Sequence, residues 1–329
     1  MRLPMSLPPF NGPPEAETGL SLPCPTPRRR ALLQMAGALC ASAAVPAAAA
    51  GPSPTLAKLR AGGVIALGYQ AAIPPFSAVD WQLRPVGFSV DLCLRVVDAL
   101  RRLPGLGALE VRWTPLTSTT RLPMVANGSV DIECGATTNT PERARRVGFS
   151  LTFFVAEIRL LTRPGRAVQR IEDLKGRSVV SMLGTTSIAR LQQLNREADL
   201  DLRIVGGYDT VECLRILQSG RAEVFALDDV VLKGLLATQP GVENLVFSPL
   251  SLSVEPYALV LPPGDAAFKA EVDAVIRQQM ASGEWLALYR RWFLEPAPPA
   301  GVSLNLPLSP AMQRLLQRPT DSAEPSAHR

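Results

Sequence analysis

Histidine is almost absent from the sequence. The single histidine among 329 residues is His328, next to the end of the chain. A serine–histidine–aspartate triad, a cysteine–histidine dyad and a histidine metal site each need histidine inside a pocket. The scarcity argues against all three. We therefore expect no catalytic residues of these types, no metal ion and no cofactor.

Cysteine is scarce as well. Only Cys93, Cys134 and Cys213 follow residue 50, and no two of them form a Cys-x-x-Cys pair. An odd number leaves at least one of the three unpaired or bonded to another molecule. The spacing does not decide which pair, if any, forms a disulfide.

Long apolar runs and basic clusters are missing beyond residue 50. No segment there has 18 uninterrupted apolar residues, so we expect this part to be soluble. Without residues 1–50, Lys+Arg falls from 34 to 30 and Asp+Glu from 29 to 27, which leaves a net charge of +3. This charge is mild, and no basic patch carries interleaved aromatic residues. We therefore expect no nucleic-acid partner.

Residues 1–50 differ in composition from the rest of the chain. They contain two acidic residues, and the consecutive Arg28, Arg29 and Arg30 precede an alanine-rich apolar run over residues 31–50. This order is typical of an export signal. Arg29-Arg30 and the apolar residues that follow also resemble a twin-arginine motif, with a general secretory signal or a retained anchor as alternatives. We expect cleavage within residues 47–50 and a periplasmic location.

The remaining sequence alternates strand-like apolar runs with amphipathic helical stretches, which predicts an α/β fold. The first group has predicted strands at 63–68, 110–116 and 130–134 and predicted helices at 90–100 and 121–126. Residues 147–162 are long and apolar, and we interpret them as a strand pair or a crossing segment rather than one strand.

A second αβ group follows in the sequence. Its predicted elements are a short helix at 171–176, strands at 178–183, 202–205 and 224–227, and helices at 184–195 and 211–217. A strand at 257–261 and a helix at 266–293, divided at Gly283, come after it. The segment after Pro296 is rich in proline, serine and leucine, and we expect it to lie along the surface.

Four blocks of sequence carry a resemblance to a known family. They are Gly-Phe-Ser-Val-Asp-Leu at 87–92, Thr-Ser-Thr-Thr-Arg-Leu-Pro at 117–123, residues 127–143 and residues 219–229. In order and spacing, residues 52–319 resemble the periplasmic solute-binding proteins of family 3, and among them the glutamate/aspartate-binding proteins of bacterial ABC importers. The resemblance implies an α/β, two-lobed periplasmic-binding-protein fold of type II, a Venus-flytrap with a two-strand hinge. It places lobe 1 at 51–153 and 254–295, lobe 2 at 154–253 and a tail at 296–329.

An α-amino acid carries a carboxylate and an ammonium, and both are costly to bury unless each is paired. The resemblance assigns the carboxylate to Arg143, whose planar fork can make two parallel hydrogen bonds, and to the hydroxyl of Thr138. Thr186, after Gly184 at a strand-to-helix turn, would bind the same carboxylate from lobe 2. Without the resemblance, Arg143 would be interpreted as a solvated helix arginine and Thr186 as part of an ordinary helix cap.

The ammonium is assigned by the resemblance to Asp228, at the carboxyl end of a predicted strand, where open α/β sheets place ligand groups. A helix N-cap is the alternative role for Asp228. Ala136 stands where the family usually has serine, so that its backbone carbonyl, but no side-chain oxygen, is available to the ammonium.

The pocket for the ligand's own side chain departs from the glutamate/aspartate receptors. Ser118 and Arg121 match one serine and one arginine of that pocket. Gln70 stands in place of a second arginine, and Thr210 in place of a histidine. We expect glutamate or aspartate as ligand, with glutamine or asparagine next. Three aromatic residues are candidates for the pocket wall or for ordinary core and surface positions: Tyr69, Phe76 and Trp81.

Two other functional classes share this fold. A dehydratase acting on prephenate or arogenate would need a buried acid in the cleft. Glu133 is the nearest acid by sequence, but the resemblance implies that the glutamate/aspartate receptors have it too, and we interpret it as structural. A sensory module for a membrane receptor is the second alternative. The interpretation we prefer is a monomeric, non-enzymatic binding protein whose partners are an amino acid and the membrane permease of an ABC transporter.

Overall fold

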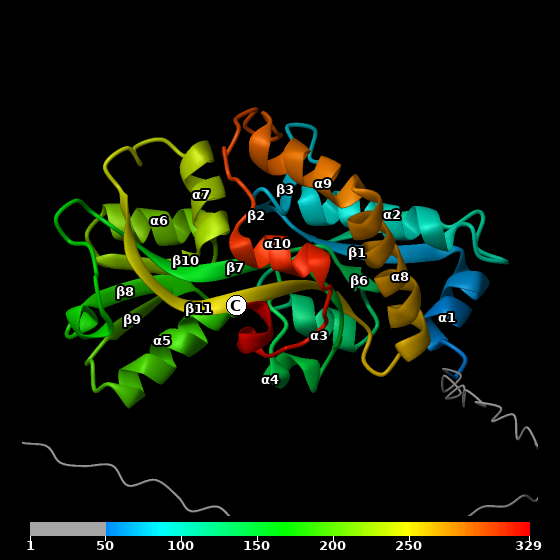
Figure 1. The fold of residues 1–329 in the computed structure, drawn as a ribbon, viewed down its shortest axis with the longest axis horizontal. Coiled ribbons are helices and arrows are strands. Elements are labelled where there is room, and N and C mark those ends of the chain that lie inside the picture. Colours follow the sequence, from blue (N-terminus) through cyan, green and yellow to red (C-terminus); the bar gives the residue numbers. More distant parts are fainter. Residues whose placement is uncertain (1–50) are drawn as a thin grey trace, which may run out of the picture. The chain divides into compact units, whose positions relative to one another are not determined.

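The computed structural model describes residues 51–329. Its eight-stranded sheet has the order β5-β1-β6-β11-β7-β10-β8-β9, so that two long strands, β7 and β11, separate two outer groups (Figure 1). Strands within each outer group run parallel, whereas β7 and β11 are antiparallel to each other. This confirms the α/β prediction. The export signal predicted at 1–50 lies outside the described residues.

The first group of the sheet alternates strands and helices. Its elements are α1 (Pro54–Gly62), β1 (Val64–Gln70), α2 (Phe88–Leu100), β5 (Glu110–Leu116), α3 (Arg121–Ala126), β6 (Ile132–Glu133) and α4 (Pro141–Ala144). A small separate sheet is formed by β2 (Ala72–Ile73), β3 (Ser77–Val79) and β4 (Pro85–Val86). Helix α1 begins where the Ser53 side chain accepts a hydrogen bond from the backbone of Leu56, and it ends at Gly63 in a left-handed conformation.

The second group repeats the alternation. Its elements are η1 (Ile171–Leu174), β8 (Ser178–Met182), α5 (Thr186–Glu197), β9 (Arg203–Gly207), α6 (Thr210–Gln218), β10 (Val224–Asp228) and α7 (Asp229–Thr238). Helices α6 and α7 lie on one face of this part of the sheet and α5 on the other (Figure 1). The five residues of β10 are all buried, as expected for a strand covered on both faces.

Two long strands join the groups. β7 (Gly148–Thr162) and β11 (Val246–Leu261) pair along most of their lengths, with Glu255 opposite Ala156. The crossing role predicted for residues 147–162 is confirmed, but the preference for something other than one strand is wrong. β7 stays continuous because it pairs with β11 along its length and with β10 near its end, so its backbone groups remain hydrogen-bonded.

The chain ends with helices packed on this frame. α8 (Ala266–Ser282) and α9 (Glu284–Tyr289) meet at Gly283, whose φ of 83° breaks the helix as predicted, and a π-helical turn follows at Arg290–Leu294. No helix was predicted in the tail. The structure has α10 (Pro310–Gln317) against β7 and a short turn η3 (Pro325–His328), and Met312 and Leu315 on α10 are buried.

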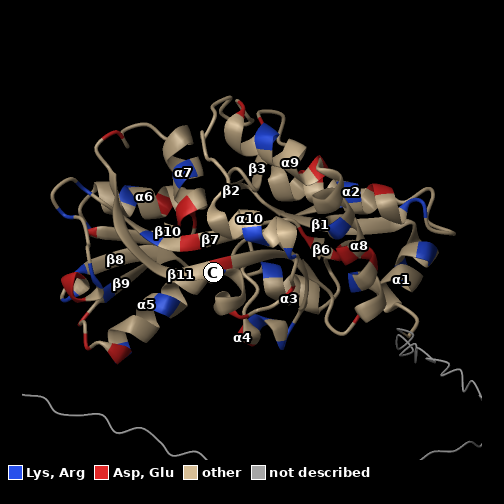
Figure 2. Ribbon diagram, viewed as in Figure 1, with Lys and Arg blue, Asp and Glu red and all other residues tan. Residues whose placement is uncertain are grey.

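An aromatic cluster packs α2 and the small sheet against β7 and the helices near the end of the chain. Phe76 packs edge-on against Phe88 and Phe154, with ring centroids 6.2 and 4.9 Å away, and Tyr289 stacks on Phe293 at 4.4 Å. Such pairs add to the stabilisation from burial of the rings. Charged residues lie outside this core, and Figure 2 shows Lys and Arg interspersed with Asp and Glu over both groups.

Candidate functional site

A small cavity lies between the two strand groups. Residues of both groups line it: Gln70, Ile73, Ser118, Arg121, Ala136, Thr138, Arg143, Met182, Thr185, Thr186, Leu227, Asp228 and Val231. Eight of the nine residues predicted for ligand binding are in this lining. They come from the carboxyl ends of strands, from the loops that follow them or from the first turns of the next helices, which is where parallel α/β sheets collect polar side chains.

Arg143 reaches the cavity from the short helix α4. The helix begins at Thr140, whose hydroxyl accepts from the backbone N–H of Arg143, and Pro141 occupies the first helical position. The guanidinium donates to the carbonyl of Thr138 at 3.0 Å and to the carbonyl of Gly184 at 3.2 Å. Burial lowers the pKa of Arg143 to about 10, so the side chain remains a cation at neutral pH.

Arg121 is the second cation of the cavity and is only 3% exposed. Its guanidinium also donates to the carbonyl of Gly184, at 3.4 Å. Burial lowers the pKa of Arg121, and the negative charge of Glu133 partly offsets this effect. Two arginines of the first group thus meet one backbone oxygen of the second.

Gly184 is suited to this contact because it has no side chain. Its φ is 77°, and a Cβ there would lie 2.7 Å from the backbone oxygen of Ser118. Any other residue would push the two groups apart at the cavity. The glycine therefore permits the close approach between the turn before α5 and the loop after β5.

Asp228 supplies a buried carboxylate at the end of β10. One oxygen accepts a hydrogen bond from the hydroxyl of Tyr257, and the other has no partner among the described residues. Burial, with the nearby charge of Glu255 as the second cause, raises the pKa of Asp228 to about 8. A cation placed against the free oxygen would favour the ionised form.

The predicted side-chain pocket contains polar groups whose hydrogen bonds are incomplete. The amide nitrogen of Gln70 donates to the hydroxyl of Ser118 at 3.1 Å, whereas its carbonyl oxygen and both oxygens of Glu133 have no partner within residues 51–329. A Cβ at Gly135 would lie 2.1 Å from a Glu133 oxygen and 2.7 Å from the Gln70 oxygen, so these acceptors are neighbours. Burial raises the pKa of Glu133, and the positive charge of Arg121 partly opposes this effect.

Glu255 on β11 belongs to the same polar network, although it was not among the residues predicted from the sequence. It is 4% exposed, and one of its carboxylate oxygens accepts from the hydroxyls of Thr138 at 2.8 Å and Thr186 at 2.7 Å. The signal available in the sequence was an acidic residue directly before the apolar run at 256–261.

Thr210 is the predicted residue that does not join the others. It begins α6, and its hydroxyl donates to the carbonyl of Ala72 at 3.0 Å, outside the lining of this cavity. The three aromatic candidates also lie elsewhere. Phe76 is a core residue, Trp81 is 84% exposed, and Tyr69 packs edge-on against Trp113.

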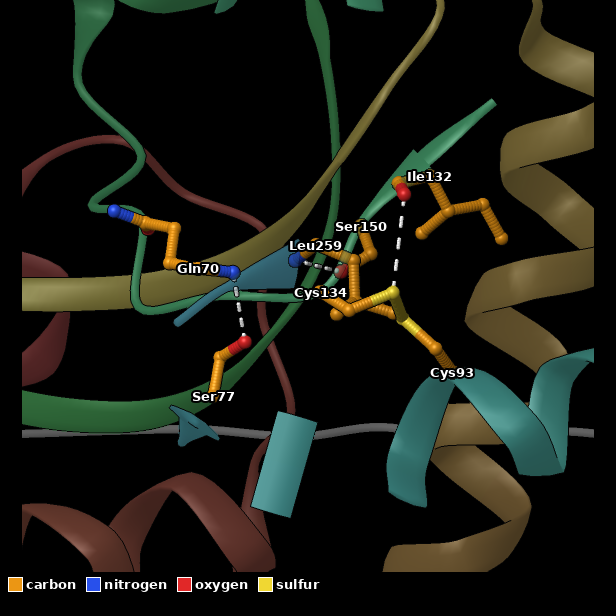
Figure 3. The surroundings of a disulfide bond; sticks show 7 residues. All are labelled: Gln70, Ser77, Cys93, Ile132, Cys134, Ser150 and Leu259. Atoms are coloured by element: carbon orange, nitrogen blue, oxygen red, sulfur yellow. Dashed lines mark hydrogen bonds between the residues drawn. A yellow bond between two sulfur atoms is a disulfide. The ribbon is translucent and has the colours of Figure 1, made fainter. Parts of the chain in front are cut away.

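A disulfide joins Cys93 on α2 to Cys134, the residue after β6 (Figure 3). It answers the question of pairing that the sequence left open, and Cys213 is the free cysteine of the described part, buried on α6. Cys134 precedes Gly135 and Ala136, so the bond anchors the segment that leads into the cavity. Figure 3 shows Gln70 near the disulfide, where its backbone N–H donates to the hydroxyl of Ser77 at 2.9 Å.

These features define a two-lobed binding protein with a charged cavity between its lobes. A family model described as bacterial extracellular solute-binding proteins, family 3, matches residues 65–295. The chain therefore belongs to this family, and the resemblance recognised in the sequence is confirmed. The two-strand hinge expected for the fold corresponds to β7 and β11.

Similar curated proteins support the same assignment. The chain is 40% identical over 270 residues to an L-glutamate/L-aspartate-binding protein of Pseudomonas aeruginosa, covering 82% of this chain and 89% of the relative. It is 37% identical over 293 residues to a glutamate/aspartate import solute-binding protein of Escherichia coli, covering 89% of this chain and 96% of the relative. These relatives are binding proteins, which supports the expected binding role over the enzymatic alternative.

Solved structures agree on the fold. A mutant of ArgBP from T. maritima superposes with a TM-score of 0.65 at 26% identity, covering 73% of this chain and 99% of that one. An ancestral amino-acid-binding protein described as a precursor of cyclohexadienyl dehydratase has a TM-score of 0.61, also at 26% identity, covering 73% and 99%. Within residues 51–329, no helix has the length and apolar character needed to span a bilayer.

Proposed function

We propose that this protein is the substrate-binding component of an ABC importer and binds a polar α-amino acid, with L-glutamate or L-aspartate first and L-glutamine or L-asparagine next. The observation that carries the proposal is the pairing of opposite charges across one cavity. Arg143 extends from the first group, and Asp228, with one free carboxylate oxygen, from the second. This is the pattern that an α-carboxylate and an α-ammonium on one carbon require.

Each ligand group has a candidate partner in the cavity. We assign the α-carboxylate to the guanidinium of Arg143 with Thr138 and Thr186, and the α-ammonium to Asp228 and the carbonyl of Ala136. Because these residues come from both sides of the β7–β11 pair, a bound amino acid would hold the two lobes together.

The distal group of the ligand faces a pocket with one cation. Arg121 can pair with a second carboxylate, and the amide of Gln70 and the hydroxyl of Ser118 offer neutral hydrogen bonds. The names of the curated relatives favour an acidic ligand, whereas the missing second cation and the neighbouring Glu133 weaken the field that would select a carboxylate over an amide. The acidic amino acids therefore rank first as ligands, and their amides second.

The remaining parts of the proposal concern the setting of the protein. We propose that residues 1–50 direct export to the periplasm, by the twin-arginine or the general secretory route. There the chain acts as a monomer and presents its closed lobes to the permease subunits of the transporter. The proposed lobe boundaries are 51–153 with 254–295 for lobe 1 and 154–253 for lobe 2. The extracellular character of the family supports this setting.

Isothermal titration of the purified chain with the common L-amino acids tests the proposal. We expect saturable binding of L-glutamate or L-aspartate, and weaker binding by Arg143→Lys, because lysine keeps the charge but loses the two-pronged contact. The expected loss is roughly tenfold to a hundredfold. Arg145→Lys, one residue beyond the end of the same helix and exposed, is the matched control and should bind like the wild type. Absence of binding heat with every amino acid would contradict the proposal.

A further inference from the structure

Glu255 is surrounded by the groups that the proposed function assigns to the ligand's α-carboxylate. Its buried carboxylate accepts the hydroxyl protons of Thr138, from lobe 1, and Thr186, from lobe 2, on one oxygen. Its other oxygen accepts from the hydroxyl of Ser253 on the same strand. The negative charge of Glu255 also acts on Arg143, where it opposes the lowering of the pKa by burial.

Each threonine hydroxyl can donate only one hydrogen bond, which limits what it can offer to the ligand. A threonine hydroxyl has one proton to donate and two lone pairs to accept with. While both protons point at Glu255, neither threonine can donate to a carboxylate in the cavity. A ligand carboxylate bound by Arg143 must therefore either take these protons from Glu255 or do without them.

The geometry points to Glu255 as an internal competitor of the ligand: we infer that its carboxylate occupies the hydroxyl donors of the α-carboxylate site and thereby weakens amino-acid binding. The inference rests on the proposed function, because it needs an amino acid that binds through this site. Glu255 lies on β11, one of the two strands that connect the lobes, and its single acceptor oxygen joins one residue from each lobe.

Replacement of the carboxylate by an amide tests the inference. Glu255→Gln removes the negative charge, so both threonines can turn their hydroxyl protons towards the ligand carboxylate. Arg143 also loses the nearby negative charge that partly neutralises it. We expect L-glutamate to bind about tenfold more tightly than to the wild type, because hydrogen bonds to a charged group are replaced by weaker ones to a neutral group. A residue that only supported the fold would give the opposite sign, weaker binding.

Glu157→Gln is the matched control. Glu157 lies on β7, opposite Val254, and pairs with Arg159 instead of with either threonine. The same change of charge there should leave the affinity within about twofold. Glu255→Asp is a second variant, which keeps the carboxylate on a side chain shorter by one methylene. We expect the affinity for L-glutamate to increase, but by less than in Glu255→Gln. Thermal melting establishes that each variant is folded before titration.

The outcomes separate the two proposals. If the wild type binds no amino acid, the proposed function fails and Glu255 has no ligand to compete with. If the wild type binds L-glutamate and Glu255→Gln binds it with unchanged or lower affinity, the competitor role is wrong and the proposed function stands. Where Glu255→Gln does not fold, the same comparison is made with Glu255→Asp. Tightening in the Glu255 variants alone supports both.

Discussion

At the scale of single residues, the candidate site is a set of buried charges whose neighbours determine what each can bind. Arg121 and Arg143 converge on one carbonyl oxygen, and Asp228 keeps one oxygen free. Buried charges are stable only when paired or hydrogen-bonded, so incomplete pairing inside a cavity indicates a ligand.

The residue at position 70 should influence which distal group of the ligand the pocket prefers. Replacement of Gln70 by arginine adds a second cation to the distal pocket, next to Ser118 and the carboxylate of Glu133. We expect Gln70→Arg to shift the ratio of L-glutamate to L-glutamine affinity towards glutamate by about tenfold or more, because a charged donor discriminates between a carboxylate and an amide. Titration with both ligands measures the ratio. Gln82→Arg places the same charge on an exposed residue and should leave it unchanged; an equal shift in both variants would contradict a role for Gln70.

The proton on Asp228 should make ligand binding depend on pH. Burial raises its pKa to about 8, so below that pH the side chain is mostly protonated. A ligand ammonium against the free oxygen favours the ionised form, and binding must then release a proton. The affinity should therefore rise as the pH increases from 6 towards about 8.

Calorimetry in buffers with different ionisation enthalpies detects this proton. At pH 7 the binding enthalpy of the wild type should depend on the buffer. Asp229→Asn, which changes the next residue along the chain, should keep this dependence. Asp228→Asn should lose the dependence together with much of the affinity. A buffer-independent enthalpy in the wild type would show that Asp228 is already ionised before binding.

At the scale of elements, the disulfide connects a helix to the strand that leads into the cavity. Cys93 lies in the middle of α2, and Cys134 follows β6 directly, 41 residues later. β6 is only two residues long, so few backbone hydrogen bonds hold this segment in the sheet. The disulfide therefore supports the approach to Gly135 and Ala136.

The element-scale prediction is a loss of stability without this bond. The closed loop restricts the unfolded chain, and removal of the crosslink in Cys93→Ala/Cys134→Ala should lower the free energy of unfolding by about 4 kcal/mol on the chain-entropy account. Urea unfolding measures the difference. A reducing agent should destabilise the wild type and leave the double variant unaffected. Equal effects on both would mean that the bond does not contribute.

At the scale of the whole molecule, the function proposed here depends on two lobes that meet at the cavity. Gly184, before α5, approaches Ser118, after β5, so closely that a Cβ would not fit. A change at this position should affect the relative position of the lobes more than the structure of either lobe.

The prediction at this scale is that Gly184→Ala opposes closure. We expect L-glutamate to bind roughly tenfold more weakly, since the closed form loses stability relative to the open one. Small-angle scattering should show a smaller decrease in radius of gyration on ligand addition than in the wild type. Gly176→Ala is the matched control, because Gly176 has a similar φ of 72° but open space around its Cβ. Closure unchanged in Gly184→Ala would contradict the role of this contact.

Much of this molecule follows from its sequence. The alternating αβ pattern, the strand at 110–116, the helix at 121–126 and the break at Gly283 depend on local periodicity and on glycine, and the structure has them where they were predicted. Residues at the carboxyl ends of parallel strands collect at one edge, and eight predicted residues therefore share the cavity.

Other features needed the tertiary structure because they arise from contacts between distant segments. Thr210 donates a hydrogen bond to the carbonyl of Ala72 instead of lining the cavity, and the carboxylate of Glu255 accepts hydrogen bonds from Thr138 and Thr186. The Cys93–Cys134 bond and the packing of α10 on β7 are likewise long-range. Local sequence patterns specify the kinds of element and the chemistry available at their ends. Only the packed chain decided which of those side chains meet, because each such contact depends on how segments far apart in the sequence are brought together.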